Sequence, residues 1–249
     1  MLEVYREGRN VKIYYEKEAV SRDKNPIFIT GFPGFGATGY ITTRFLVEAL
    51  KMKRIGFVMT KYMPDTVIID PEQRFNFPHE IYSGLDGKVI VLVNQTVPSP
   101  MEKDEFAESL VKWVHRNNFS EMLLVGGLDA EIRRSSDEYM RWIGNKYCKR
   151  TLEEPLMDKG LVIVGPLATL LMYSEIIGVP ALAILPYAER NRPDPRAAAV
   201  AVSKIAKILN TEIDVSELIK HAEAIEVLER KIRSEIESTR EGLAHRFYM

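Results

Sequence analysis

The sequence predicts an α/β protein in which a mostly parallel β-sheet is flanked by helices and followed by a long C-terminal helical extension. Strand-like and helix-like segments alternate about five times between residues 27 and 209, a pattern typical of a parallel sheet with helices on both faces. In residues 88–93 five consecutive apolar residues follow Lys88, as in a strand that is buried on both faces. After Asn210 the chain becomes charge-rich and loses its strand signal. We therefore expect an α/β body over residues 1–212 and a C-terminal helix with a docking tail over residues 213–249.

The first half of the chain predicts strands that alternate with two helices. Apolar residues at helical spacing predict helices over Thr38–Leu50 and Lys103–Asn117. Pro71 and Pro78 mark residues 70–79 as an irregular crossing loop. Strands are expected over Val11–Tyr15, Pro26–Thr30, Ile55–Thr60, Thr66–Ile69, Lys88–Val93 and Glu121–Val125.

The second half continues the alternation after residues 135–151, which carry no clear signal. Pro166 suits a first helical turn, and Gly178 is suited to end that helix. Asp194 is a favourable N-cap, with Pro195 at the first helical position. These signals predict strands over Leu161–Val164 and Pro180–Leu185 and helices over Leu167–Ile177 and Asp194–Leu209.

Residues Asp214–Leu243 predict one long amphipathic helix. The segment contains no proline, and its only glycine is Gly242. Its apolar residues recur at intervals of three or four among Glu, Lys and Arg, which is the spacing of one helix face. A continuous helix of this length would extend about 45 Å at 1.5 Å per residue. The apolar stripe consists of Leu218, Ala222, Ile225, Leu228, Ile232 and Ile236.

The overall composition excludes several classes of protein. With 34 Lys and Arg against 35 Asp and Glu, the 249-residue chain has no broad positive field for nucleic acid. Its apolar runs are too short to span a membrane, and its N-terminus lacks the apolar core of a signal peptide. The single cysteine, Cys148, cannot form an internal disulfide, and no residue cluster has metal-ligand spacing. We expect a cytoplasmic globular protein without a cofactor or metal.

A glycine-rich turn, Gly31–Gly39, follows a predicted buried strand and opens a predicted helix. It resembles a P-loop, but Ala37 occupies the position of the phosphate-binding lysine. It also fits G-x-G-x-x-G, but the next strand ends at Thr60-Lys61 rather than at an acidic residue. We favour a packing role for these glycines, with an anion site at the helix N-terminus as the alternative. The glycines concerned are Gly31, Gly34, Gly36 and Gly39.

Two acidic residues, Asp129 and Glu131, follow the strand end at Gly126-Gly127, where α/β sheets usually bind ligands. They could serve as a general acid and base, which gives an alternative function: a phosphorylase-like or hydrolase-like enzyme that holds an anion at residues 31–39. Because Arg133 and Arg134 follow immediately, an ion-paired surface turn is the favoured interpretation.

The chain ends with Phe247, Tyr248 and Met249. Exposed terminal aromatic residues favour association, so this tail either packs on its own body or docks on a partner. As a docking peptide it would offer an aromatic ring, a hydroxyl group and a free carboxylate, and capture of a C-terminal carboxylate is a recurring recognition mode. The three residues resemble the hydrophobic–Tyr–any-residue terminus with which proteasome activators insert between α-subunits of the core particle.

The whole chain resembles the archaeal proteasome-assembly-chaperone family, whose members are homologues of the eukaryotic proteasome assembly chaperones. The resemblance covers roughly residues 27–209 and rests on four features. These are the Gly-Phe-Pro-Gly signature at Gly31–Gly34, the strand end at Gly126-Gly127, the Gly165-Pro166 turn before a leucine-rich helix, and the alanine-rich helix Asp194–Leu209.

The resemblance implies a three-layer body related in fold to the nucleoside phosphorylases but without their chemistry. It also implies a homo-oligomer, a tetramer or pentamer, whose C-terminal helices present the tails. On this hypothesis the protein is not an enzyme and binds the α-subunits of the proteasome core particle without ATP, through Phe247, Tyr248 and Met249. A third hypothesis is a structural assembly protein whose tail serves only its own oligomer.

Overall fold

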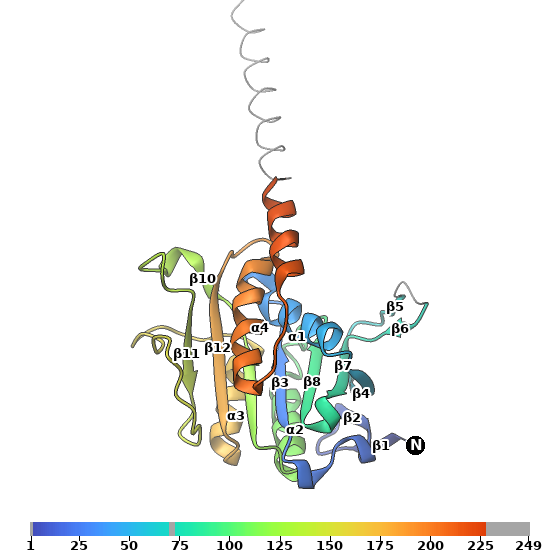
Figure 1. The fold of residues 1–249 in the computed structure, drawn as a ribbon. Helices are drawn as coiled ribbons and strands as arrows, with labels where there is room; N and C mark the ends of the chain where they lie inside the picture. Colours follow the sequence, from blue (N-terminus) through green and yellow to red (C-terminus); the bar gives the residue numbers. More distant parts are fainter. Residues whose placement is uncertain (1, 70–72, 228–249) are drawn as a thin grey trace, which may run out of the picture.

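The computed structural model describes residues 2–69 and 73–227 of the chain (Figure 1). Strands of the main sheet are β1 (Leu2–Tyr5), β2 (Val11–Glu16), β3 (Ile27–Gly31), β4 (Lys53–Thr60), β7 (His79–Gly84), β8 (Val89–Asn94), β9 (Glu121–Val125), β10 (Leu128–Asp129), β11 (Met140–Gly144) and β12 (Ala181–Ala188). The helices are α1 (Thr38–Ala49), α2 (Lys103–Arg116), α3 (Pro166–Ile177) and α4 (Pro195–Leu209). Short 3₁₀ turns occur at Lys17–Ala19, Arg22–Lys24, Phe35–Ala37, Leu85–Gly87 and Ala130–Ile132.

The main sheet is mixed, with a parallel half and an antiparallel half. Its order is β1-β2-β4-β7-β8-β3-β9-β12-β10, and β11 pairs with β12. From β8 through β3, β9 and β12 to β10 the neighbours are parallel, as predicted for the centre of the sheet. From β1 to β8 the neighbours are antiparallel. The antiparallel half depends on β7, which the sequence analysis missed and which runs between β4 and β8 in the opposite direction to both.

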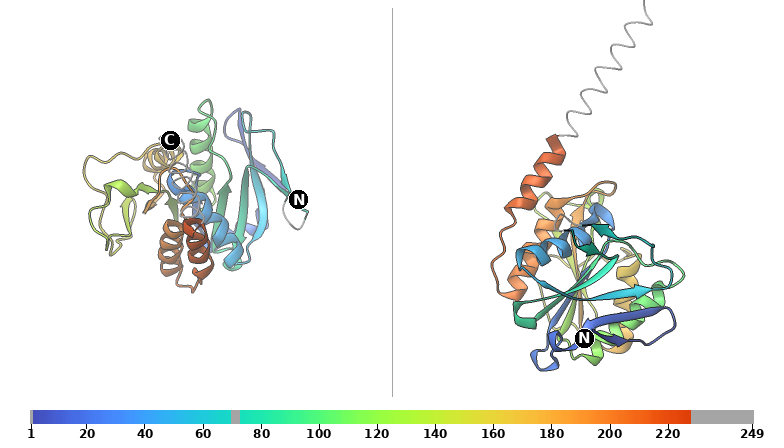
Figure 2. Two further views of the ribbon diagram at one scale, coloured as in Figure 1. Left: turned by 90° about the horizontal axis from the view of Figure 1, so that it is seen from above. Right: turned by 90° about the vertical axis from the view of Figure 1, so that its right-hand side faces the viewer.

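The helices cover both faces of the sheet and confirm the α/β architecture. α2 and α3 pack together on one face, and α1 and α4 pack together on the other (Figure 2). Strand β3 lies at the centre and is buried on both sides. Its Phe28 belongs to the core under α2, where it meets Trp113, whereas the next residue, Ile29, belongs to the core under α1 and α4. This alternation is the two-residue period of a strand between two helical layers.

The predicted ends of two helices are confirmed. Pro166 is the first residue of α3, and Gly178 ends that helix with a left-handed backbone at φ 90°. The Asp194 carboxylate accepts a hydrogen bond from the backbone N–H of Ala197 at 3.1 Å, so it caps α4 as expected.

Two strand predictions differ from the structure. Residues Leu161–Val164 are irregular, and in the part of the chain that the structure describes no strand pairs with them. Thr66–Ile69 shortens to β5 (Ile68–Ile69), which pairs with β6 (Phe75–Asn76) in a separate two-stranded sheet. Local composition favours a strand in both places, but a strand also needs a neighbour with free backbone groups.

A helix over residues 216–227 begins the predicted C-terminal extension and packs beside α4 (Figure 1). The Asp214 carboxylate accepts a hydrogen bond from the backbone N–H of Ser216 at 2.9 Å and so caps the helix start. Leu218 and Ala222 are buried, which confirms the first two positions of the predicted stripe. The remainder of the predicted helix, with Leu228, Ile232 and Ile236, lies outside the described residues.

Helix α1 crosses the end of β3 at a contact between two glycines. A β-carbon on Gly31 would lie 2.5 Å from the Cα of Gly39. A β-carbon on Gly39 would lie 2.5 Å from the carbonyl oxygen of Val125 and 2.6 Å from the amide nitrogen of Phe32. The helix therefore rests directly on the backbones of β3 and β9, and this contact leaves no space for a side chain.

A buried polar network joins the antiparallel half of the sheet to the parallel half. The Asn94 amide, at the end of β8, donates hydrogen bonds to the Thr30 hydroxyl and to the carbonyl oxygen of Gly31, both at 2.9 Å. The Asn94 side-chain oxygen lies 2.8 Å from Nδ1 of His79, at the start of β7. Burial lowers the pKa of His79 to about 4, so its imidazole is neutral at pH 7.

We predict that Gly39→Ala destabilises the protein and that Gly34→Ala does not. At Gly39 the new methyl group meets backbone atoms of β9 and of the turn after β3, so the free energy of unfolding should fall by about 2 kcal/mol or more. At Gly34 a β-carbon would meet nothing within 4 Å, and a change within about 0.5 kcal/mol is expected. Urea denaturation of both variants measures the difference, and equal losses would contradict the close packing.

We also predict that stability falls between pH 7 and pH 5 because of His79. The unfolded histidine, with a pKa of about 6.5, binds a proton in this range, whereas the folded one stays neutral. The folded state should therefore lose about 2 kcal/mol relative to the unfolded state as the pH falls through this range. His79→Leu removes this contribution, so its unfolding free energy should depend less steeply on pH. The same slope in both proteins would show that His79 does not titrate as described.

Candidate functional site

The carboxyl ends of β3, β9 and β12 meet at one edge of the sheet, where α/β proteins commonly bind ligands. The structure brings three of the sequence motifs together here: the turn after Gly31, the Gly126-Gly127 pair and the Gly165-Pro166 turn. Together with residues 162–164 they line a pocket of about 340 Å³.

The pocket is apolar, and none of its lining side chains is ionisable. Gly34 lies on its wall, and the lining residues include no lysine or arginine that could balance a phosphate group. This composition fits an uncharged, apolar group better than the anion considered from the sequence. The lining residues are Phe32, Pro33, Gly34, Phe35, Val97, Val125, Gly126, Gly127, Leu128, Val162, Ile163, Val164, Gly165, Pro166, Leu167 and Leu185.

The other glycines of the turn have structural roles. Gly31 and Gly39 form the contact between β3 and α1. Gly36 has a left-handed backbone at φ 63°, and its carbonyl oxygen accepts a hydrogen bond from the backbone N–H of Asp194 at 2.8 Å. A β-carbon there would lie 2.8 Å from the Cβ of Asp194. The turn thus links the start of α1 to the start of α4.

The carboxylate of Asp129 is already engaged. It caps the following 3₁₀ turn by accepting a hydrogen bond from the backbone N–H of Glu131 at 3.1 Å, and it forms an ion pair with Arg190. Asp129 is buried, whereas Glu131 is exposed, and the pairing of the Asp129 carboxylate does not favour a role as general acid or base.

The predicted ion-paired turn exists, but its cation comes from another segment. Arg133 donates hydrogen bonds to the carbonyl oxygens of Ser135 and Ser136, and Arg134 pairs with Asp158 at 2.8 Å. The actual partner of Asp129 is Arg190, which the sequence places 61 residues later. Proximity in the sequence therefore indicated the wrong ion-pair partners for Asp129.

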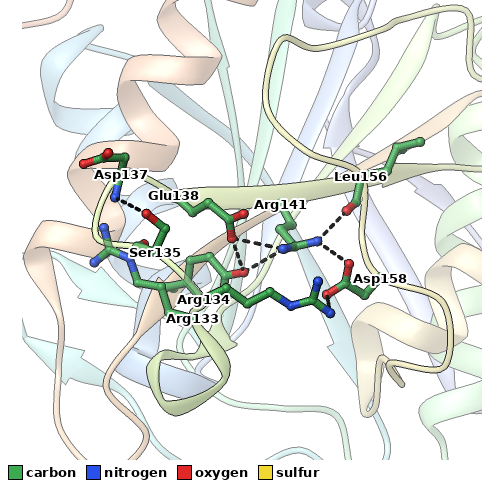
Figure 3. A network of polar contacts seen from close by, with 9 residues as sticks. Arg133, Arg134, Ser135, Asp137, Glu138, Arg141, Leu156 and Asp158 are labelled. Carbon is green, nitrogen blue, oxygen red and sulfur yellow. Dashed lines mark hydrogen bonds and ion pairs between the residues drawn. The ribbon is translucent and has the colours of Figure 1, made fainter.

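A polar network surrounds Arg141, and no local sequence pattern indicated it (Figure 3). The Arg141 side chain is 5% exposed, and its guanidinium pairs with Asp158 at 2.6 Å and with Glu138 at 3.0 Å. Its Nε donates a hydrogen bond to the Tyr187 hydroxyl at 2.7 Å. This hydrogen bond and the two carboxylates raise the pKa of Arg141. The network fastens β11 to β12 and to the loop that holds Leu156, so its charges serve the fold.

A larger groove of about 910 Å³ runs between α4, the helix at residues 216–227 and the segments near residues 133–140 and 153–155. Charged side chains line it, and two ion pairs form across it. Arg196 of α4 pairs with Glu226 at 2.8 Å, and Lys204 of α4 pairs with Glu154. The groove wall thereby fixes the first helical turns of the C-terminal extension to the body.

The predicted docking residues, Phe247, Tyr248 and Met249, lie outside the described residues. What the structure describes is the start of the segment that leads to them. Two buried side chains, Leu218 and Ala222, and the ion pair of Glu226 hold that segment against α4.

Within residues 2–69 and 73–227, no helix is both long and apolar enough to cross a membrane. Over the same ranges, no three or more His, Cys, Asp or Glu side chains are grouped so that they could hold a metal ion.

Comparison with known proteins identifies relatives along most of the chain. An uncharacterised protein of Methanocaldococcus jannaschii is 30% identical over 210 residues, which cover 82% of this chain and 83% of that protein. Pyrococcus furiosus PbaA, described as an archaeal homolog of proteasome-assembly chaperone, is 26% identical with a TM-score of 0.79, and the match covers 96% of this chain and 98% of PbaA. Pyrococcus furiosus PbaB, described as an archaeal proteasome activator, has the same fold, with a TM-score of 0.71, 22% identity and coverage of 94% and 98%.

A family model described as the PAC2 family matches residues 28–232. This range includes the four features on which the sequence resemblance rested: the glycine-rich turn, the strand end at Gly126-Gly127, the Gly165-Pro166 turn with helix α3, and helix α4. It also reaches beyond the body into the C-terminal extension. Because the model matches most of the chain and the Methanocaldococcus relative matches at 30% identity, the chain belongs to the PAC2 family.

Proposed function

We propose that this protein is a non-enzymatic, cytoplasmic archaeal factor that binds the proteasome core particle without ATP, as an assembly chaperone or activator. One observation carries the proposal: the chain is a PAC2 family member that matches, over nearly its whole length, a protein described as an archaeal homolog of proteasome-assembly chaperone. The contact with the core particle is made by Phe247, Tyr248 and Met249, which dock on the α-ring.

The chemistry of the tail suits this role. The Phe247 ring would fill an apolar slot between two α-subunits, and the Tyr248 hydroxyl would make a hydrogen bond. The carboxylate of Met249 would pair with a lysine of the α-ring, as in other sites that capture a chain terminus. The side chain of the last residue contributes least, because any residue carries the same carboxylate.

The fixed start of the extension supports docking by the tail. Leu218 and Ala222 are buried against the body, and Glu226 pairs with Arg196 of α4. Fixing the start of the segment limits the positions open to its terminus, and this reduces the entropy lost when the terminus binds. A homo-oligomer, a tetramer or pentamer, would present several tails at once and raise avidity by about 10²–10⁴ over a single tail.

The body supports an ATP-independent and non-enzymatic role. Ala37 stands where a P-loop needs lysine, and the pocket at the strand ends is lined by uncharged side chains. The carboxylate of Asp129 is held by Arg190 and by the backbone N–H of Glu131. The enzyme alternative would need a free acid or base at this edge of the sheet.

We predict that Tyr248→Ala weakens binding to archaeal proteasome core particles at least tenfold, because a buried ring and its hydrogen bond are both lost. Surface plasmon resonance with immobilised core particles measures affinity, and hydrolysis of a fluorogenic peptide by the same particles measures activation. Met249→Ala is the matched control: it also shortens a terminal side chain but keeps the carboxylate, so it should bind within about threefold of the unmodified protein.

A short tag fused after Met249 tests the carboxylate, because it moves the negative charge away from the docking residues. We expect the tagged protein to bind as weakly as Tyr248→Ala. If Tyr248→Ala and the tagged protein both bind and activate as well as the original chain, docking through the tail is wrong.

A further inference from the structure

The connections that follow β3 and β9 leave the sheet on opposite faces. The two strands are parallel neighbours, so their carboxyl ends lie side by side. The chain continues from β3 into α1, in the layer of α4, whereas the next helix after β9 is α3, in the layer of α2. α/β proteins bind small ligands where neighbouring connections diverge in this way. The apolar pocket of about 340 Å³ lies at this divergence, since the ends of both strands line it.

Three of the residues that line the pocket are exposed valines. Val97 is 48% exposed, Val162 is 76% exposed and Val164 is 72% exposed. The first follows β8 and the other two precede α3, so the valines reach the pocket from two separate segments. Leu167 and Leu185, which also line the pocket, are buried. Apolar residues that stay exposed around an apolar pocket are typical of a ligand-binding site.

The segment before α3 carries hydrogen-bond donors beside this pocket. In the part of the chain that the structure describes, the backbone N–H groups of residues 162–165 form no hydrogen bond. The lining side chains themselves carry no hydrogen-bonding group. In ligand pockets, a few backbone N–H groups commonly fix the orientation of a mostly apolar molecule. Residues 162–165 are therefore the source of donors in a pocket that is otherwise apolar.

Two glycines on the lining leave space that a side chain would occupy. A β-carbon on Gly126 would lie 3.2 Å from Cδ2 of Leu185 and 3.4 Å from Cδ1 of Leu167, and both leucines line the pocket. A larger side chain at Gly126 would therefore extend between these leucines and narrow the pocket. A β-carbon on Gly34 would meet nothing within 4 Å.

We propose that this pocket binds a small, uncharged and mostly apolar molecule that carries a hydrogen-bond acceptor such as a carbonyl group. Its volume lies at the lower end of the range of about 300–1,000 Å³ found for ligand pockets, which suits a molecule built on one ring. Because no lining side chain is ionisable and an unpaired buried charge is costly, the ligand is neutral. The backbone N–H groups of residues 162–165 bind the acceptor. This site is separate from docking by the tail.

The first test measures the affinity of the full chain for three probes by fluorine NMR: para-fluoroacetophenone, para-fluoroethylbenzene and para-fluorobenzoate. The ketone has a ring and an acceptor, the hydrocarbon has the ring alone, and the benzoate adds a charge. We expect the ketone to bind about fivefold more tightly than the hydrocarbon, because it gains one hydrogen bond. The benzoate should bind at least about tenfold more weakly than the ketone. Equal affinities, or no binding of the ketone at millimolar concentration, would overturn the proposal.

The second test locates the bound ketone with variants of the lining. Val164→Asp places a charge at an exposed lining position and should weaken binding by about tenfold or more. Val67→Asp is the matched control, because Val67 is 51% exposed and does not line the pocket, and its affinity should stay within about twofold. Gly126→Val narrows the pocket and should weaken binding as much as Val164→Asp, and circular dichroism verifies that each variant is folded. Unchanged affinity in both lining variants would show that the ketone binds elsewhere and overturn the proposal.

Hydrogen exchange tests the donors and the identity of the occupant. Saturating ketone should slow exchange at residues 162–165 by about tenfold, whereas the hydrocarbon should not. Unchanged exchange with the ketone contradicts the assigned donors. Deletion of Phe247–Met249 tests whether the tail of the same chain fills the pocket instead. Equal ketone affinity with and without the tail supports the small-molecule site, whereas binding by the shortened chain alone would assign the pocket to the tail.

Discussion

The contact between Gly31 and Gly39 determines where the functional parts of the body lie. Because neither residue has a side chain, α1 rests directly on the ends of β3 and β9. The turn between them is held close to the sheet. In this turn the carbonyl oxygen of Gly36 accepts a hydrogen bond from the backbone N–H of Asp194, the N-cap residue of α4. The turn that resembles a phosphate loop therefore has a structural role: it connects α1 and α4 to the sheet. The packing role of the turn follows from the short distances between backbone atoms at Gly31 and Gly39, which leave no room for a β-carbon.

Strand β7, in the antiparallel half of the sheet, shows how partners that are distant in sequence allow polar residues to be buried. His79 and Glu80 open β7 and are both buried. The first contacts Asn94 of β8, and the second pairs with Arg54 of β4 at 2.6 Å. A buried carboxylate or imidazole is costly unless such partners are present. Strand β7 can therefore stand between β4 and β8 only because both neighbours supply polar groups.

This dependence explains which elements could be predicted from the sequence. β9 and α4 carry their signals locally, as an apolar run and as an Asp-Pro cap, and both were predicted to within two residues. β7 was missed because its polar residues look exposed until Asn94 and Arg54 are placed beside them. The strand prediction at Leu161–Val164 was wrong for the opposite reason. The local composition favours a strand, but a strand must also pair with a neighbouring strand. Arg190 could not be assigned to Asp129 from spacing, and the docking role of Phe247–Met249 stays a prediction.

The two helical layers lie on opposite faces of the sheet, and the start of the C-terminal extension packs on the layer that holds α4. The C-terminal extension starts beside α4, in a layer rich in paired charges such as Arg196 and Glu226. α3 lies in the other layer, with α2, and its outward side is nearly free of charge. The near balance of 34 basic and 35 acidic residues therefore says little about any one helix: α3 carries one charged side chain, Glu175, whereas α2 in the same layer carries six.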